Sequence, residues 1–563
     1  MDIKEEVIKV LAKETKFKKE EISSMLEVPP NTEMGDFAFP CFKLSSVFKK
    51  NPLDIAKQLK NNIKIKEPLE RLEAKGPYLN IFVNKQEEIT SALNINKDYG
   101  KSSIGKSKKV VIDFSSPNIG KPMHIGHIRS TAIGDSLMRM YNFLGYNPIG
   151  INYLGDIGLH IGKLIVAWEL WLDKKALKED PVKELLRIYV KFCEKEKSEF
   201  QEETDEEDYE NNEWTNKAKE KLKLIEIGDE KAHKIWKEIR NASGKGFDKI
   251  YKMLKVDFHE TTGQSKFSDA GKEIVLNAVK KGLAKTEQDT GAIYMEFEKL
   301  PKKYILRSNG TASYLTQDLG AATERYKKYS FEKMIYVVDY RQQLHFQQLF
   351  EILKKMGYNF SEKCEHVGFG TVNFGKEIIA SRTGKIVLLE DVLKKTIEKA
   401  QQEIKKRKTK GDSEKIGVGA IKYIILRNEP SRNVEFSWDA ALSFEGDTGP
   451  YLQYSYARAS SILKKSKKKP KLNPKGEIIK QELELVKKIA EFPKIVEQAA
   501  EKLNPSLVAH YSFELAQLFN EFYHACPVID SEQEEFRLKL IDSFRITLKN
   551  ALYLLGIEVM DEM

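Results

Sequence analysis

The chain has 563 residues, of which 41% are hydrophobic and 32% charged, and its formal net charge is +10. This length predicts three or four domains, and no run of about 18 apolar residues could span a membrane. The four cysteines lie far apart without a C-x-x-C pair, which excludes a zinc site and a disulfide framework of the usual spacing. We expect a cytoplasmic protein. Its mildly basic charge permits a polyanionic partner without requiring one.

Residues 1–95 predict a small α/β domain. Helical periodicity is mixed there with β-like runs, and the segment closes with GPYLNIFVN, whose Gly-Pro turn and alternation predict a strand. From 106 to 398, strand-like runs such as KMIYVVDY alternate with helical runs such as HFQQLFEILKKMG. That alternation is typical of a parallel sheet. The highly charged stretch from about 168 to 258 predicts a helical insertion into this domain.

The last third of the chain, residues 399–563, predicts a helical domain. Strand signals fade and long amphipathic stretches run to the end. We therefore expect an α/β fold with a central parallel-sheet domain, a small α/β domain before it and an all-helical domain after it.

Two histidines and a lysine follow the apolar run Val110–Phe114 in the stretch SSPNIGKPMHIGHIRST, called the histidine stretch below. A strand, a short loop and a helix N-terminus form an anion site, because backbone N–H groups and the helix dipole point at it. Gly126 allows close approach of a ligand, Lys121 adds charge, and His124 and His127 can donate to phosphate oxygens. A single histidine here would more often be structural. The combination of two histidines and a lysine favours a nucleoside triphosphate as the ligand.

The histidine stretch resembles the HIGH signature of class I aminoacyl-tRNA synthetases, in the form found in arginyl-tRNA synthetases. Further segments extend the resemblance over nearly the whole chain, among them NYLGDIGLHIGKLI, NGTASYLTQDLGAA, HVGFGTV and EGDTGPYLQYSYAR. It implies a Rossmann-like catalytic domain, an N-terminal domain that contacts the outer corner of tRNA and a C-terminal anticodon-binding domain. It also implies a monomer that joins L-arginine to tRNA(Arg) with ATP and Mg²⁺, without zinc.

Binding of the arginine side chain requires carboxylates in a planar arrangement, with an aromatic face or neutral acceptors nearby. Asp113 ends the strand before the histidine stretch, and the spacing of Tyr314 and Asp318 places both on one helical face. The resemblance implies that these three residues hold the substrate side chain. It assigns the α-amino and carboxylate groups of arginine to Ser116, Asn118, His124 and Gln342.

The resemblance also assigns the ATP contacts. It places the adenine base on Phe369, Gly370 and Val372, and the phosphates on Gly126 and His127. The second class I signature, K-M-S-K-S, corresponds to IIASRTGKIVLLEDVL, in which no lysine matches its second Lys. Ser381 is implied in ATP binding, and the predicted catalytic residues are Lys121, His124, His127 and Arg382. Lys121 is expected to replace the missing lysine, with Lys385 as the alternative.

Aromatic and basic residues in EGDTGPYLQYSYAR are suited to stacking on bases and pairing with phosphates. Tyrosines at this spacing are more often packing residues, but the resemblance implies tRNA contacts by Tyr451, Tyr454 and Arg458, and by the terminal Met563.

Two alternatives stay open at this point. One is a class I synthetase for another amino acid, with lysine the nearest candidate, and the other is a tRNA-binding relative without catalysis. The segment NYLGDIGLHIG also departs from the family, which more often has Trp and Gln where this chain has Ile157 and His160. Its residues Asn152, Gly155 and Asp156 either contact a ligand or shape a supporting loop.

Overall fold

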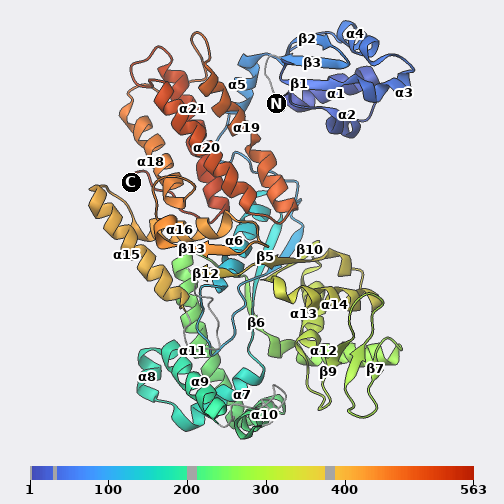
Figure 1. Cartoon of the computed structure of the whole chain (residues 1–563), viewed down its shortest axis with the longest axis vertical. Helices are drawn as coiled ribbons and strands as arrows, with labels where there is room; N and C mark the ends of the chain where they lie inside the picture. Colours follow the sequence, from blue (N-terminus) through green and yellow to red (C-terminus); the bar gives the residue numbers. More distant parts are fainter. Residues whose placement is uncertain (1–2, 30–33, 199–211, 375–386) are drawn as a thin grey trace. The chain divides into compact units, whose positions relative to one another are not determined.

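The computed structural model describes residues 3–29, 34–198, 212–374 and 387–563. Contacts divide the chain into two compact units (Figure 1). One unit comprises Met1–Tyr99, Ile462–Glu491 and Gln517–Thr547, and the other comprises the remaining segments, Gly100–Ser461, Phe492–Ala516 and Leu548–Met563. Among the described helices, none combines the length and the apolar character needed to cross a membrane.

The N-terminal residues form a small sheet with helices packed on it, as predicted. Strand β3 (Tyr78–Val83) lies between β1 (Phe37–Pro40) and β2 (Leu69–Lys75), and both pairings are antiparallel. The accompanying helices are α1 (Ile3–Thr15), α2 (Lys19–Met25), α3 (Ser45–Phe48), α4 (Pro52–Asn62) and α5 (Lys85–Leu93). Buried side chains from Val7 to Ile81 form one core of their own.

The larger unit is built on a five-stranded sheet in the order β11-β10-β4-β5-β6, in which every pairing is parallel. Its strands are β4 (Lys109–Asp113), β5 (Asn147–Leu154), β6 (Glu260–Gly263), β10 (Lys333–Asp339) and β11 (Cys364–Phe369). The predicted parallel sheet is therefore confirmed. Strand β5, the next in the chain, pairs with one side of β4, whereas β10 pairs with its other side. A reversal of this kind leaves a crevice at the carboxyl ends of the strands, where ligands bind in open α/β sheets.

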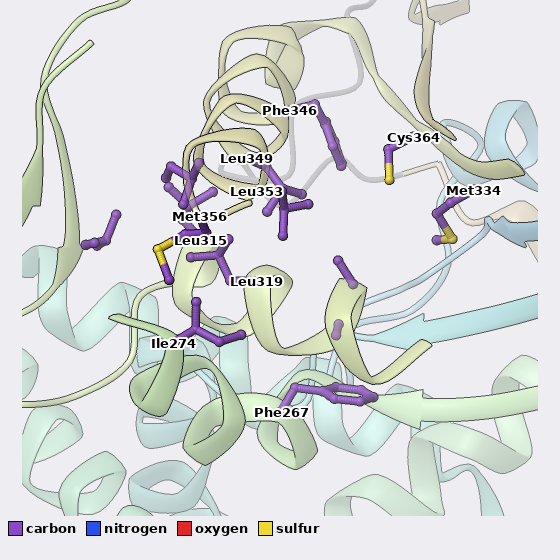
Figure 2. Close-up of a cluster of buried hydrophobic side chains, with 14 of the residues drawn as sticks. Phe267, Ile274, Leu315, Leu319, Met334, Phe346, Leu349, Leu353, Met356 and Cys364 are labelled. Atoms are coloured by element: carbon purple, nitrogen blue, oxygen red, sulfur yellow. The ribbon is translucent and has the colours of Figure 1, made fainter. Parts of the chain in front are cut away.

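Three helices position the residues at that edge. Helix α6 (His127–Phe143) follows β4, while α13 (Tyr314–Tyr329) and α14 (Gln343–Lys355) flank β10 in sequence. Figure 2 shows Leu315 and Leu319 of α13 among the core residues, together with side chains of α14. Because two residues of α13 are buried in the core, the rotation of this helix about its axis is fixed.

The charged stretch predicted as an insertion is helical in the residues that are described. Helices α7 (Leu159–Trp171), α9 (Pro181–Ser198) and α10 (Glu213–Glu226) pack together, and the long α11 (Glu230–Leu254) leads back to the sheet (Figure 1). A short helix, α8 (Lys174–Glu179), lies between α7 and α9 in sequence.

The C-terminal third is helical apart from one short strand. Strand β13 (Val434–Phe436) pairs in parallel with β12 (Val372–Phe374). Three residues are too few to show a period-two pattern, so the sequence did not predict this strand. The helical character predicted for the C-terminal domain is confirmed. The helices are α15 (Leu389–Arg407), α16 (Ser413–Leu426), α17 (Trp438–Ala441), α18 (Gly449–Lys465), α19 (Lys480–Glu501), α20 (Ser506–Ala525) and α21 (Glu534–Leu554).

Candidate active site

The backbone turns sharply where β4 ends. Ser115 and Ser116 have φ angles of 69° and 47°, a left-handed conformation that costs an L-residue about 1 kcal/mol or more. The turn is held by hydrogen bonds: the Ser115 N–H donates to Ser130 Oγ at 2.8 Å, and Ser116 Oγ donates to Asp113 Oδ1 at 2.8 Å. Strained backbone that the surroundings enforce is typical of functional sites. Here it directs the histidine stretch along the carboxyl edge of the sheet.

Asp113 is buried and bonded to residues of its own chain. Its Oδ2 lies 2.8 Å from a terminal nitrogen of Arg325, whose guanidinium stands 4.7 Å from the ring centroid of Tyr153. Burial raises the pKa of Asp113 above its ordinary value, and the charge of Arg325 opposes that shift. Sequence reasoning missed Arg325, although its spacing of seven from Asp318 along one helix places both on the same face.

Asp318 and Tyr314 project from the first turns of α13. The carboxylate Oδ2 of Asp318 lies 2.6 Å from Nε2 of His345 on α14, and both side chains are largely buried, whereas Tyr314 is half exposed. The charge of Asp318 raises the pKa of Asp113, after the larger effect of burial. The structure thus brings the two predicted acids close together. It adds His345, which the sequence did not distinguish from the other residues of an amphipathic helix.

The residues assigned to the α-amino and carboxylate groups of arginine lie at the ends of neighbouring strands. Ser116 follows β4, and its Oγ also accepts from the Tyr153 N–H at 3.1 Å. Asn118 is exposed and forms an isolated bridge with Gly155 just after β5. A Cβ on Gly155 would lie 1.9 Å from Asn118 Oδ1, so a larger residue there would displace the Asn118 side chain. Gln342 is exposed after the end of β10.

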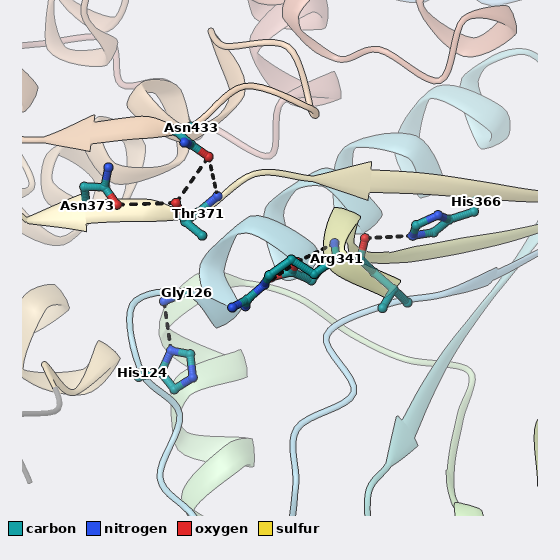
Figure 3. A network of polar contacts seen from close by, with 9 residues as sticks. His124, Gly126, Arg341, His366, Thr371, Asn373 and Asn433 are labelled. Carbon is teal, nitrogen blue, oxygen red and sulfur yellow. Dashed lines mark hydrogen bonds and ion pairs between the residues drawn. The ribbon is translucent and has the colours of Figure 1, made fainter. Parts of the chain in front are cut away.

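The two histidines of the histidine stretch have defined hydrogen-bonding states, of which Figure 3 shows the contact between His124 and Gly126. The Gly126 N–H donates to His124 Nδ1 at 3.1 Å, and the His124 N–H donates to His127 Nδ1 at 3.0 Å. The latter contact is shorter than the 3.3 Å between His127 Nδ1 and the carbonyl of His124. Since both Nδ1 atoms accept, the neutral rings carry their hydrogens on Nε2.

Burial keeps these rings neutral. It lowers the pKa of His127 to about 3 and that of His124 to about 4, the latter with help from the charge of Lys121. Each imidazole therefore offers an uncharged Nε2–H donor at physiological pH. Helix α6 begins at His127, and the N–H groups of its first three residues donate to the carbonyls of His124, Ile125 and Gly126.

Lys121 of the histidine stretch contacts the helical insertion. Its Nζ stands 5.0 Å from the ring centroid of Tyr189 on α9, within cation–π range. Its charge lowers the pKa values of His124 and His160. Lys121, His124 and His127 thus lie close together, whereas Arg382 is outside the described residues.

The predicted adenine segment follows β11. Phe369 is the last residue of that strand, and the Gly370 N–H donates to the carbonyl of Pro430 at 2.9 Å. Figure 3 shows the next contact, in which the N–H and Oγ1 of Thr371 both donate to Asn433 Oδ1. Val372 is buried at the start of β12.

The second signature cannot be placed in the same way, because Ser381, Arg382 and Lys385 lie outside the described residues. The chain that follows them runs beside the histidine stretch. The Ile125 N–H donates to the carbonyl of Val387 at 3.2 Å, and the Leu389 N–H donates to that of Met123 at 2.9 Å.

The loop after β5 supports the site from behind. Asp156 is fully buried, and its carboxylate accepts from the backbone N–H and the Oγ of Ser265, each at 2.9 Å. Its carbonyl accepts from Trp236 Nε1 at 2.7 Å. Of the two interpretations left open for this segment, these contacts favour a supporting loop.

His160 gives the site a testable pH dependence. Burial lowers its pKa to about 4, whereas an unfolded histidine titrates near 6.5. Between these values the unfolded chain binds the extra proton, so the unfolding free energy falls on acidification by up to about 1.4 kcal/mol per pH unit. We expect His160→Gln to remove this loss. Urea unfolding of both proteins at pH 7, 6 and 5 checks it, and an identical pH dependence in the two would contradict it.

Three of the four residues predicted to contact tRNA, Tyr451, Tyr454 and Arg458, lie on α18. Arg458 Nη2 donates to the Tyr454 hydroxyl at 3.2 Å, and the guanidinium lies 4.8 Å from that ring centroid. The ring of Tyr451 makes an edge contact with Phe513 at 5.8 Å, and Met563 is partly exposed. Their contacts with tRNA remain predictions.

Among the described residues, no three His, Cys, Asp or Glu side chains gather closely enough to hold a metal ion. The four cysteines are free thiols, and three of them are buried.

Comparison with known proteins bears on the whole chain. Residues 88–438 match the family described as tRNA synthetases class I (R), catalytic domain; residues 452–563 match the DALR anticodon binding domain; and residues 1–83 match the arginyl tRNA synthetase N terminal domain. The arginine–tRNA ligase of Clostridium beijerinckii is 40% identical over 577 residues, covering 100% of both chains.

Solved structures agree with this assignment. The arginyl-tRNA synthetase of Thermus thermophilus superposes with a TM-score of 0.80 at 25% identity, covering 99% of each chain. That of Plasmodium falciparum gives a TM-score of 0.78 at 25% identity, covering 100% of this chain and 99% of its own. The chain therefore belongs to the arginyl-tRNA synthetase family of class I aminoacyl-tRNA synthetases.

Proposed function

We propose that the chain is an arginine–tRNA ligase, which uses ATP to form arginyl-adenylate and then transfers arginine to the terminal ribose of tRNA(Arg). One observation carries the proposal beyond family membership. Two neutral Nε2–H donors at the start of α6 and two neighbouring acids, Asp113 and Asp318, lie at the carboxyl edge of the same sheet. Such an edge can hold a triphosphate and a guanidinium side by side.

In the first step, the carboxylate of arginine attacks the α-phosphorus of ATP and pyrophosphate leaves. Asp318 and Tyr314 would orient the guanidinium, with Asp113 behind them. Negative charge develops on the phosphate oxygens as the bond to pyrophosphate breaks. His124, His127 and Lys121 would donate to those oxygens, together with Arg382, so the protein acts by positioning and charge neutralisation. Mg²⁺ bound to the triphosphate would neutralise further charge.

In the second step, a hydroxyl of the terminal ribose attacks the carbonyl carbon of arginyl-adenylate and AMP leaves. No covalent bond to the protein forms in either step. We propose that Tyr451, Tyr454, Arg458 and Met563 contact tRNA, that the N-terminal domain contacts its outer corner, and that the protein works as a monomer.

The test is aminoacylation of a mixed tRNA pool with ATP, Mg²⁺ and each amino acid in turn. We expect charging with arginine alone. We also expect ATP–pyrophosphate exchange only when tRNA is present, because the second signature lacks its lysine. Charging with lysine would overturn the assignment of the pocket. A folded protein that binds tRNA and charges no amino acid would instead be the non-catalytic relative.

Arg458 offers a test of the tRNA face. We expect Arg458→Met to weaken tRNA binding and to reduce the slope of log affinity against log salt by about 1, because one phosphate contact is lost. Fluorescence titrations at four salt concentrations measure both. Lys464→Met, in the last turn of the same helix, is the matched control, because Lys464 is not among the residues predicted to contact tRNA. A weaker affinity with an unchanged slope would show that Arg458 acts through Tyr454 instead of phosphate.

A further inference from the structure

A fully buried arginine, Arg129, lies two residues beyond His127 on α6. Its side chain has 0% exposure. One terminal nitrogen donates to the carbonyl of Ile425 at 2.7 Å. The other approaches the carbonyls of Glu429, Pro430 and Arg432 at 3.1, 2.5 and 2.9 Å. Arg129 thus binds one carbonyl in the last turn of α16 and three carbonyls of the turn that follows this helix.

The environment of Arg129 is unusual for a buried cation. Among the described residues no carboxylate pairs with it, and its charge is solvated by backbone carbonyl dipoles. Burial lowers its pKa to about 10, so it stays charged at physiological pH. Burying a charge without a counter-charge is costly. The unpaired charge of Arg129 therefore indicates that this side chain maintains the geometry of the turn.

The turn held by Arg129 also receives the predicted adenine segment. The Gly370 N–H donates to Pro430, one of the four carbonyls, and the Thr371 N–H donates to Asn433 Oδ1 (Figure 3). The Val434 N–H donates to the carbonyl of Thr371 at 2.9 Å. A Cβ on Gly370 would lie 2.6 Å from the carbonyl oxygen of Arg432. The two segments are therefore in close contact along their length.

We propose that Arg129 is a positioning residue for ATP: it fixes the turn 429–433, and this turn fixes the adenine segment Phe369–Val372. One side chain of α6 thereby sets the distance between the phosphate donors at the start of that helix and the segment that holds the base. This inference rests on the proposed function, because ATP contacts by Phe369, Gly370 and Val372 are part of it.

Lysine cannot replace arginine in this role. The guanidinium is planar and presents its donors in a fixed fork, which reaches carbonyls on both sides of the turn, whereas an ammonium is a point donor on a flexible stem. Arg129→Lys keeps the charge and loses the fork. We expect the KM for ATP to rise about tenfold, the size of losing one hydrogen bond to a charged group, and the KM for arginine to change by less than about twofold.

The experiment measures aminoacylation kinetics and hydrogen exchange on the same full-length proteins. In Arg129→Lys, peptides covering 368–374 and 428–436 are expected to exchange faster, while peptides from β4 keep their protection. Arg139→Lys is the matched control, because Arg139 lies on the same helix but binds Asp135 at 3.0 Å. It should alter neither KM.

A second variant keeps the proposal testable if Arg129→Lys does not fold. Asn433→Ala leaves Arg129 intact and removes the acceptor of Thr371, so it should reproduce the rise in the KM for ATP alone. An equal rise in both KM values, or unchanged exchange at 368–374, would overturn the inference. If the wild-type protein charges no arginine, the proposed function fails, whereas the exchange measurement still reports on the hold of Arg129 over the turn.

Discussion

Asp318→Ala is expected to lower kcat/KM for arginine by about 100- to 1,000-fold, the usual cost of removing one partner from a buried, hydrogen-bonded charge pair. The substrate guanidinium would then lose the carboxylate of Asp318, and Asp113, which is already paired with Arg325, would compensate little. Steady-state aminoacylation with varied arginine measures the loss. Affinity for tRNA, measured by filter binding, should change by less than about twofold.

Two further variants sharpen this result. Asp318→Asn keeps the shape and one acceptor, so it separates charge from packing and should recover only a small part of the activity. Glu324→Gln changes an exposed acid on the same helix, whose partner is Lys327, and should have no effect. Equal losses of arginine recognition and tRNA affinity in Asp318→Ala would identify Asp318 as a structural acid.

His127→Ala is expected to lower kcat by about 100- to 1,000-fold, the effect of removing one preorganised donor to a developing oxyanion. His127→Gln places an amide donor near the position of Nε2 and should recover part of the rate. His259→Gln is the control, since His259 accepts from the Gly150 N–H away from the histidine stretch. Single-turnover formation of the adenylate, followed with labelled ATP, gives the rate.

The pH profile provides an independent check of that role. With folded pKa values of about 3 and 4, both histidines are neutral donors throughout the range from pH 6 to 8. The wild-type rate should therefore show no step near pH 6.5 that disappears in His127→Gln. Such a step would mean that a charged imidazolium, instead of a neutral imidazole, donates to the phosphate oxygens.

Local sequence patterns were enough to predict the elements that carry the site. The β-branched run before the histidine stretch predicted a strand, which is β4. The spacing of Tyr314 and Asp318 predicted one helical face, which α13 provides, and the alternation of strands and helices predicted the parallel sheet. Each of these features depends on residues a few positions apart, so it can be predicted from the periodicity of the sequence.

The contacts that complete the site join segments that are distant in the sequence, so they cannot be predicted from its periodicity. Arg325 lies 212 positions beyond Asp113 in the sequence, and His345 meets Asp318 only because α13 and α14 pack on the same core. The side chains that surround a glycine in space cannot be predicted from the sequence pattern either. Gly126 was predicted to admit a ligand, and the structure shows that a Cβ there would lie 2.9 Å from the His124 ring.

The division of the chain into two units bears on how it folds during synthesis. The N-terminal core closes on itself between Val7 and Ile81, so it can form as soon as it leaves the ribosome. The segment just after it must wait, because Leu93 accepts its hydrogen bond from Ser543, 450 residues later. At about 5–20 residues per second, that partner arrives after roughly 20 to 90 s. A nascent chain therefore carries an unfinished surface around α5 for most of its translation, and this surface is where a chaperone would be expected to bind.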